Sequence, residues 1–148
     1  MSMLPSAILR YIWAAPATTV GLALAVIACA LGATIRFKQG VLEVAGGRLA
    51  RAASMMPCSL RLSAITFGHV VIGVSHSLLD EERAHEHEHV RQYEHWGILF
   101  FPLYVASSAV QLLRGRHPYR HNRFERQAFQ AASIRTSHLV LRHGDEKS

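Results

Sequence analysis

The feature that most constrains the fold of this chain is an apolar segment near its N-terminus. Residues 13–35 contain no charged side chain, and the basic residues Arg10, Arg36 and Lys38 flank them. A helix of about 20 apolar residues is long enough to cross the hydrocarbon core of a bilayer. We therefore expect a transmembrane helix in this segment.

A cleaved signal peptide is the alternative interpretation, because Ala28, Cys29 and Ala30 resemble a small-x-small cleavage site. An uncleaved anchor fits better, since the first basic residue comes only at Arg10 and the apolar run continues past Cys29. Basic residues are more numerous after the span than before it. This excess predicts a protein of the bacterial inner membrane whose body is cytoplasmic.

Composition narrows the classes of function. A chain of 148 residues is one domain by size, half of its residues are hydrophobic, and its formal net charge is +6. The arginines are scattered without a basic and aromatic stripe, which argues against a nucleic-acid partner. Two cysteines form neither a disulfide framework nor a zinc knuckle. These properties are typical of a membrane protein with a basic soluble part, and they predict membrane lipid as one partner.

A pair of histidines four residues apart lies in residues 85–89, which read His-Glu-His-Glu-His. On a helix, His85 and His89 project about 40° apart on one face, where both imidazoles can reach one metal ion. Glu86 then lies beside that metal without ligating it and is free to accept a proton from the attacking water. This spacing is the HExxH pattern of zinc metallopeptidases.

The surrounding sequence predicts the helix that this geometry requires. Ser77 and Asp80 have the spacing of a capping box, and the acidic residues 80–82 complement the positive end of the helix dipole. No glycine or proline follows until Gly97, which is a suitable C-cap. The motif therefore lies in the middle of a helix.

A catalytic zinc needs a third protein ligand and an open position for water. Glu125 is one candidate, on a further helix predicted at residues 122–133. His95 is the other, because it follows His85 by ten residues, as in the pattern HExxHxxGxxH. Gln92 occupies the glycine position of that pattern, so a continuing helix would point His95 away from the metal-binding face. This geometry favours Glu125.

The HExxH motif, followed by the Asn-x-x-Glu-x-x-Ala of residues 122–128, resembles the gluzincin group of zinc metallopeptidases. The small size is similar to that of its minimal members, the minigluzincins. The resemblance covers about residues 64–130. It implies that Glu86 is the general base and that the ligands of a Zn²⁺ cofactor are His85, His89 and Glu125.

Two further details bear on the resemblance. Residues 89–92, His-Val-Arg-Gln, resemble the HxxQ extension of several such domains. Many relatives carry an aspartate directly after Glu-x-x-Ala, where it orients the first histidine, whereas this chain has Phe129. Glu82 or a backbone carbonyl would have to replace that aspartate, because a second hydrogen bond fixes the tautomer of a ligand histidine.

These features together predict an α+β fold that is mainly helical. A transmembrane helix precedes a small zincin-like domain, which consists of short antiparallel strands, the HExxH helix and the glutamate-ligand helix. The expected divisions are a tail and anchor at 1–37, a metallopeptidase domain at 38–137 and a polar tail at 138–148.

Two segments have the composition of strands. Residues 41–47 alternate at period two and end in a glycine pair, and residues 64–74 are rich in β-branched side chains. The resemblance implies that an edge strand before the metal-binding helix pairs with an extended peptide substrate. Within the second segment, His69 is expected to be packed and not a metal ligand. Residues 48–62 are interpreted as an amphipathic stretch against the membrane surface.

The uncharged stretch at residues 97–113 is short for a membrane span. A single crossing there would put Glu125 on the opposite side of the bilayer from His85 and His89. We therefore interpret this stretch as a buried, interfacial or re-entrant helix.

Hydrolysis also needs a donor that stabilises the oxyanion. The loop before the glutamate helix offers Tyr119 and His121, with His117 beside them, and Tyr93 on the HExxH helix is a weaker candidate. The alternative interpretation is a basic surface loop that faces anionic lipid or solvent.

The favoured function is a membrane-anchored zinc metalloendopeptidase that hydrolyses a peptide or protein substrate, including membrane-proximal segments. A second interpretation is a non-catalytic metal-binding or metal-sensing membrane protein that uses His87 and His95. A third is a structural protein in which residues 85–89 form a charged helix face. Glu86 and Glu125 separate the three, because only catalysis requires both.

Overall fold

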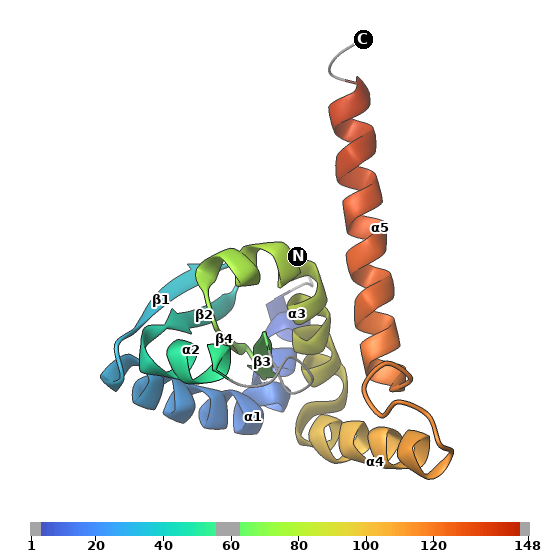
Figure 1. The fold of residues 1–148 in the computed structure, drawn as a ribbon, viewed down its shortest axis with the longest axis horizontal. Helices are drawn as coiled ribbons and strands as arrows, with labels where there is room; N and C mark the ends of the chain where they lie inside the picture. The colour runs from blue at the N-terminus through green and yellow to red at the C-terminus, as the bar shows by residue number, and fades with distance from the viewer. Residues whose placement is uncertain (1–3, 56–62, 146–148) are drawn as a thin grey trace.

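The computed structural model describes residues 4–55 and 63–145 (Figure 1). Its elements, in chain order, are α1 (Leu4–Ala30), β1 (Ala33–Lys38), β2 (Val41–Gly46), α2 (Gly47–Ser54), β3 (Ala64–Phe67), β4 (Val70–Gly73), α3 (His76–Trp96), the 3-10 helix η2 (Gly97–Leu99), α4 (Phe100–Leu113) and α5 (Arg123–Asp145). The described chain is mostly helical and contains a small sheet, which confirms the predicted α+β class.

The four strands form one mixed sheet in the order β1-β2-β4-β3. β1 pairs antiparallel with β2, and β3 pairs antiparallel with β4, but β2 and β4 run parallel. The prediction of antiparallel strands is therefore correct within each hairpin and wrong between the hairpins. Parallel neighbours need a crossover connection, and α2 and β3 lie in the connection from β2 to β4.

Residues 64–74 form a hairpin of two strands, not the single strand predicted. The chain reverses at Gly68, whose φ of 57° lies in the left-handed region. A Cβ at Gly68 would lie 2.2 Å from the Oγ1 atom of Thr18 on α1. The composition of residues 64–74 predicts extended structure correctly. The turn could not be predicted, because it depends on close contact with a helix that is distant in the sequence.

The sheet is packed on both faces. On the α1 side, the buried core residues are Ala25, Ala28, Val44 and Val70. On the α3 side, they are Val41, Ala45, Val71, Leu79 and Val90. Alternate residues of β2 and β4 thus point to opposite faces, as the pleat of a strand requires.

α1 contacts the rest of the protein through a stripe of small residues at helical spacing. The buried members of this small-residue stripe are Ala14, Ala17, Gly21, Ala25 and Ala28. The large apolar side chains point outward, so that Val26 is 70% exposed. The helix ends at Ala30, and Gly32 has a φ of 89°. Residues 31–35, predicted as the end of the span, therefore form a turn and the start of β1.

Two helical segments are long and apolar enough to cross a membrane, Ile8–Ala30 and His76–Leu113. The second runs through α3, η2 and α4, and its uncharged part begins after His95. These segments favour association with a membrane. The cytoplasmic position of the body stays a prediction.

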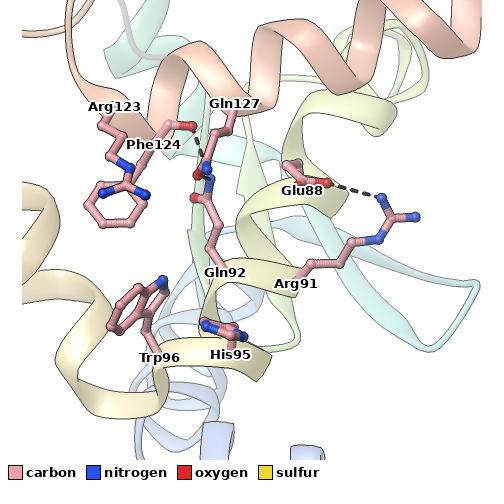
Figure 2. Close-up of a pocket in the computed structure, with 8 residues that line it drawn as sticks. All are labelled: Glu88, Arg91, Gln92, His95, Trp96, Arg123, Phe124 and Gln127. Atoms are coloured by element: carbon pink, nitrogen blue, oxygen red, sulfur yellow. Dashed lines mark hydrogen bonds and ion pairs between the residues drawn. The ribbon is translucent and has the colours of Figure 1, made fainter.

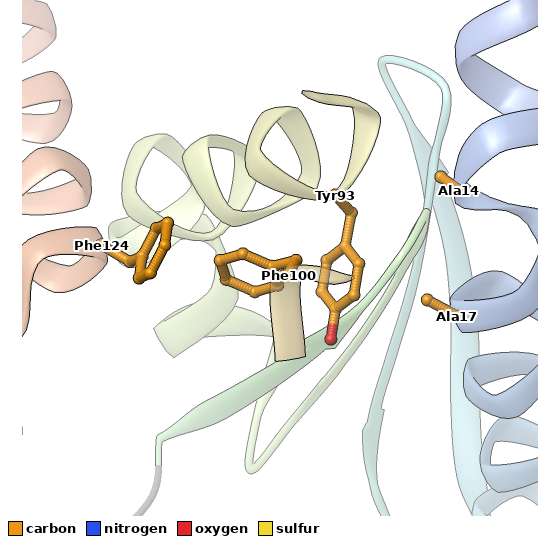
Figure 3. Packing of buried hydrophobic residues seen from close by; sticks show 5 residues of the cluster. All are labelled: Ala14, Ala17, Tyr93, Phe100 and Phe124. Atoms are coloured by element: carbon orange, nitrogen blue, oxygen red, sulfur yellow. The ribbon is translucent and has the colours of Figure 1, made fainter. Parts of the chain in front are cut away.

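A third hydrophobic cluster joins α1 to the C-terminal half of the fold (Figure 3). Tyr93 of α3 and Phe100 lie between Ala14 and Ala17 of α1 on one side and Phe124 of α5 on the other. The centroid of the Phe100 ring lies 4.4 Å from that of Tyr93 and 5.2 Å from that of Phe124. This cluster fixes the position of α5 relative to α3.

The helix that carries the HExxH motif is capped at both ends. Ser75 is its N-cap, and the Ser75 side chain accepts a hydrogen bond from the backbone N–H of Leu78 at 3.2 Å. The N-cap therefore lies two residues before the predicted cap, Ser77. Gly97 is the C-cap, as predicted, with a φ of 56°.

The remaining helices differ from the predictions in length. α5 begins at Arg123 and continues to Asp145, so residues 138–145 of the predicted polar tail are helical. α2 begins at Gly47, one residue before the predicted amphipathic stretch, and covers the first part of it; the later residues 56–62 lie outside the described residues.

We expect Arg83→Ala to lower the free energy of unfolding by about 3–5 kcal/mol. Arg83 on α3 donates from Nε and Nη2 to the two carboxylate oxygens of Glu43 on β2, at 2.8 and 3.2 Å. Glu43 is 2% exposed, so removal of the guanidinium leaves a buried carboxylate unpaired. Denaturant unfolding of the detergent-solubilised protein measures the loss.

Arg91→Ala is the matched control. The side chain of Arg91 is 64% exposed, and its ion pair with Glu88 is of the surface type that contributes about 0–1 kcal/mol. Equal losses in the two variants would contradict a structural role for the pair between Glu43 and Arg83.

Candidate metal centre

Three side chains that could ligate a metal converge between α3 and α5. The Nε2 atoms of His85 and His89 lie 3.2 Å apart. Glu125 Oε2 lies 3.2 Å from His85 Nε2, and Glu125 Oε1 lies 3.4 Å from His89 Nε2. The ligand atoms all lie within 4.8 Å of one another, and the three residues are buried. The structure thus brings together the three residues predicted as ligands, and this group could hold one metal ion.

Gln92 sets the tautomer of His89. The Nε2 atom of Gln92 donates to the backbone carbonyl oxygen of Phe124 at 3.0 Å, so its Oε1 is the atom that lies 2.9 Å from His89 Nδ1. An amide oxygen only accepts, which makes Nδ1 the protonated nitrogen of His89. The lone pair of His89 Nε2 is therefore free for a metal.

Glu125, the candidate oxygen ligand, is ionised. Tyr104 on α4 donates from its hydroxyl to Glu125 Oε1 at 2.6 Å. Burial opposes ionisation, but the adjacent imidazoles of His85 and His89 and the hydrogen bond from Tyr104 outweigh it and lower the pKa of Glu125 well below its usual range. The carboxylate is therefore charged at neutral pH and available as an oxygen ligand.

The predicted general base lies on the same helix as the two histidines. Glu86 is buried, and its Oε2 accepts a hydrogen bond from the Oγ1 hydroxyl of Thr66 on β3 at 2.7 Å. Burial raises the pKa of Glu86 above its ordinary value. A raised pKa suits a carboxylate that must take up a proton and pass it on.

The donor set fits zinc. Two imidazole nitrogens and one carboxylate, with a fourth position left for water, form the ligand set of catalytic zinc sites. Apart from its ion-pair contact with His85, Oε2 of Glu125 is buried without a hydrogen-bond partner among the described residues. An ionised oxygen in that condition is the one expected to face a cation.

His85 lacks the support that His89 has. Its Nδ1 is buried and has no hydrogen-bond partner in the described part of the chain. The ring of Phe129 packs against it instead, with ring centroids 4.6 Å apart. Glu82, the substitute considered for the missing aspartate, accepts a hydrogen bond from Ser63 Oγ at 2.7 Å. Phe129 therefore supplies an aromatic wall where many gluzincins have an acceptor.

A cavity of about 650 Å³ opens onto these groups. Its lining includes His85, Glu86, His89 and Glu125, together with Phe100, Phe101 and Tyr104 from the α4 region. β3 also lines the cavity, from Ala64 to Phe67. A volume of this size accommodates one or two amino-acid side chains of a peptide next to the candidate metal centre.

β3 is the edge strand beside this cavity. It is the last strand in the sheet order, and no other described strand pairs with its outer edge. The backbone N–H of Val74 donates to the carbonyl of Ser63 at 3.0 Å, which makes these two residues a hydrogen-bonded pair of the hairpin. By the alternation of an antiparallel ladder, Ala64 and Thr66 direct their backbone groups away from β4. Among the residues that the structure describes, no strand pairs with these groups, so they can bind an extended chain.

The two predicted oxyanion donors differ in position. Tyr119 lines the cavity. Burial and the neighbouring Glu125 carboxylate raise the pKa of Tyr119, so its hydroxyl stays protonated and can donate. His121 is exposed and does not line the cavity, and its Nδ1 lies 3.3 Å from the carbonyl oxygen of His117. The structure therefore supports Tyr119 and does not bring His121 to the site.

Two further histidines, His95 and His69, lie apart from the metal-binding group, whereas His117 lines the same cavity as that group. His95, the alternative ligand, borders a second cavity of about 350 Å³ formed by α3 and α5, where Gln92 and Gln127 are in contact (Figure 2). His69 is packed, as predicted: its ring stacks on Tyr11 with centroids 4.1 Å apart, and its Nε2 lies 3.1 Å from Glu94. Neither histidine belongs to the group around His85.

Two residues of the site had no sequence signal. Thr66 holds Glu86, and Tyr104 holds Glu125, and each acts across about 20 residues of chain. No local motif predicts such contacts, since they depend on how the elements pack. Gln92 did carry a signal, because it occupies the last position of the HxxQ pattern.

Comparisons with known proteins add no independent assignment. No protein-family description, no curated protein and no solved structure matches this chain. A functional assignment therefore depends on the chemistry of the site.

We expect Gln92→Met to lower the affinity for zinc by about 10- to 100-fold, because it removes the acceptor that orients His89. Competition with a chromogenic chelator measures the affinity. Gln127→Met is the control, since Gln127 contacts Gln92 at 3.3 Å but is not a partner of His89. An unchanged affinity in Gln92→Met, or equal losses in both variants, would contradict the role of Gln92 in orienting His89.

Proposed function

We propose that this protein is a membrane-associated zinc metallopeptidase of the gluzincin type. The observation that carries the proposal is the convergence of His85, His89 and Glu125 on one point, with Glu86 buried beside them. This is the arrangement expected of an HExxH helix with a glutamate ligand from a second helix.

Each residue of the site has a role in the proposed hydrolysis. Zinc, when bound, supplies a Lewis acid that lowers the pKa of a water and polarises the scissile carbonyl. Glu86 takes the proton from the attacking water and passes it to the leaving amine. Thr66 holds Glu86 in place through its hydrogen bond. Tyr119 donates a hydrogen bond from its hydroxyl to the developing oxyanion.

The edge strand supports a peptide as substrate. The free backbone groups of Ala64 and Thr66 can pair with an extended chain without regard to its sequence. Phe100, Phe101 and Tyr104 line the cavity and favour an apolar or aromatic side chain next to the scissile bond. The proposed substrates are unfolded or extended polypeptide segments.

Burial argues against a purely structural role for the motif. His85, Glu86, His87 and His89 are all buried, whereas a solvated face of ion pairs would expose them. Ionisable groups are rarely buried together unless they are paired or bind a metal.

The experiment that tests the proposal is hydrolysis of a quenched fluorescent casein by the purified full chain, before and after chelation and after addition of Zn²⁺. We expect activity that chelation abolishes and zinc restores. Zinc binding without hydrolysis would overturn the peptidase and support the alternative, a metal-binding membrane protein. A chain that neither binds zinc nor cleaves casein would overturn both.

A further inference from the structure

α4 is amphipathic in the opposite sense to a surface helix of a water-soluble protein. Its polar residues face the protein: Asn122 donates to Ser108 Oγ at 2.7 Å, and the backbone N–H of Arg123 donates to Ser107 Oγ at 3.2 Å. Five apolar residues of α4 are exposed on its outer side, namely Leu103, Val105, Val110, Leu112 and Leu113. Contiguous exposed apolar surface of this kind marks a face that an apolar partner covers.

α1 and β1 extend this surface. α1 buries its small-residue stripe and exposes its large side chains, such as Ile27 at 54%. On β1, Ile35 and Phe37 are exposed, and by the alternation of the strand they point to the same side of the sheet as Ala33, which packs with the α1 side of the core. α4 and the later turns of α1 lie along the lower edge of Figure 1, while the first turns of α1 and the whole of α5 rise away from that edge. We call the outer sides of α1 and α4, with Ile35 and Phe37, the apolar face.

The segments that form the apolar face contain no acidic residue. Neither residues 1–42 nor residues 95–124 contain an aspartate or glutamate. The loop after α4 instead carries three exposed arginines, Arg114, Arg116 and Arg120. Trp13 and Tyr119 are also exposed, at 51% and 41%, and aromatic residues of this kind are enriched at membrane interfaces. Anionic lipid complements such a face, whereas a second copy of the chain would oppose like charges.

We propose that the apolar face docks into the interface of an anionic bilayer, with α1 and α4 in the plane of the membrane and neither helix crossing it. The docking rests on the membrane association in the proposed function and not on its metal chemistry. Both termini of the chain then lie on one side of the membrane.

The packing of α1 opposes a crossing. The small-residue stripe contacts the protein over residues 14–28, roughly 20 Å of helix. A crossing α1 would carry the attached sheet into the hydrocarbon, where the free backbone groups at the outer edges of β1 and β3 would have no partner. An in-plane α1 keeps the sheet in water and buries only the outward side chains.

The length of α4 and the metal centre oppose a crossing of α4. Its 14 residues span roughly 21 Å, which is shorter than the hydrocarbon core of about 30 Å. A single crossing by the segment between α3 and α5 would also separate Glu125 from His85, although their side chains lie 3.2 Å apart. The helix therefore lies along the membrane.

The first test is the sidedness of the two termini. The full chain, with a short epitope tag at each end, is expressed in bacteria, and sealed right-side-out and inverted membrane vesicles are treated with protease. We expect the protein to stay with the membrane after a high-salt wash and both tags to be cleaved from the same side. Tags on opposite sides would overturn the proposal. A chain recovered in the soluble fraction would also overturn it, and a soluble dimer would identify a second copy as the occupant.

The second test is the immersion depth along α1. Spin labels replace the exposed residues Ile12, Val20 and Ile27 one at a time, in a chain with Cys29→Ser and Cys58→Ser, reconstituted in vesicles of phosphatidylcholine and phosphatidylglycerol. We expect three similar depths, about 5–10 Å below the headgroups. A crossing helix would place Val20 roughly 12 Å deeper than Ile12 and would overturn the proposal. Zinc content of the same samples reports separately on the metal centre, so equal depths without zinc would contradict only the proposed function.

The third test concerns lipid charge. We expect the triple variant Arg114→Gln, Arg116→Gln, Arg120→Gln to bind phosphatidylglycerol vesicles on the order of 100-fold more weakly, at about fivefold per arginine, with binding to phosphatidylcholine unchanged. Equal binding of wild type and variant to both vesicles would overturn the assignment of anionic lipid.

Discussion

We expect Glu86→Gln to retain its zinc and to hydrolyse peptide about 10²- to 10⁴-fold more slowly than wild type. Glu86 lies outside the group of ligands, so the substitution removes the proton acceptor and leaves the metal-binding atoms in place. The Thr66 hydroxyl can still donate to the amide oxygen, which keeps the new side chain in position. The measurement is kcat on a fluorogenic peptide, with zinc content determined by mass spectrometry on the same sample.

Glu88→Gln is the matched control for this variant. Glu88 lies two residues further along α3 and forms an ion pair with Arg91 at 3.0 Å. The Glu88→Gln substitution removes one negative charge from the same helix, as Glu86→Gln does. We expect kcat to be unchanged, because substitutions away from the site have small effects. Cleavage at the wild-type rate by Glu86→Gln would exclude Glu86 as the general base.

The second large effect is expected for Glu125→Ala, which should bind zinc more than about 100-fold more weakly than wild type. Loss of a residue that only supports a ligand costs about 10- to 100-fold in affinity, and loss of the ligand itself should cost more. The substitution also frees the hydroxyl of Tyr104, whose acceptor is Glu125. Zinc titration in competition with a chelator gives the affinity, and peptide hydrolysis should fall in parallel.

Arg126→Ala controls for damage to α5, because Arg126 is the exposed neighbour of Glu125. Its zinc affinity should equal that of wild type. If Glu125→Ala retained wild-type affinity, the third ligand would be another residue. His95 would not be that residue, because it borders the second cavity and not the metal centre.

The convergence of the candidate ligands His85 and His89 could be predicted because it depends on local periodicity. Four residues of helix separate His85 from His89, and this spacing places both on one face wherever the helix packs. Glu125 needed a second helix with a recognisable motif, and α5 begins at Arg123, close to the predicted start. The contacts of Thr66 and Tyr104 could not be predicted, because they arise only when β3 and α4 pack beside α3 and α5.

The packing of α1 against the sheet could not be predicted from hydropathy. Hydropathy identifies residues that avoid water, and it cannot distinguish lipid on all sides of a helix from protein on one side and lipid on the other. The small-residue stripe, which contains Ala14, Gly21 and Ala28, is the feature that separates these cases, because it lets the sheet approach closely. Gly32 ended the helix before the predicted boundary at Ile35.

The most direct test of the central claim is X-ray absorption at the zinc edge, measured on the purified chain loaded with one equivalent of zinc. If His85, His89 and Glu125 hold the metal with one position open, the spectrum should contain two imidazole ligands and oxygen ligands at about 2.0–2.2 Å. A sulfur ligand at about 2.3 Å, a shell made only of imidazoles, or a chain that binds no zinc would contradict the account.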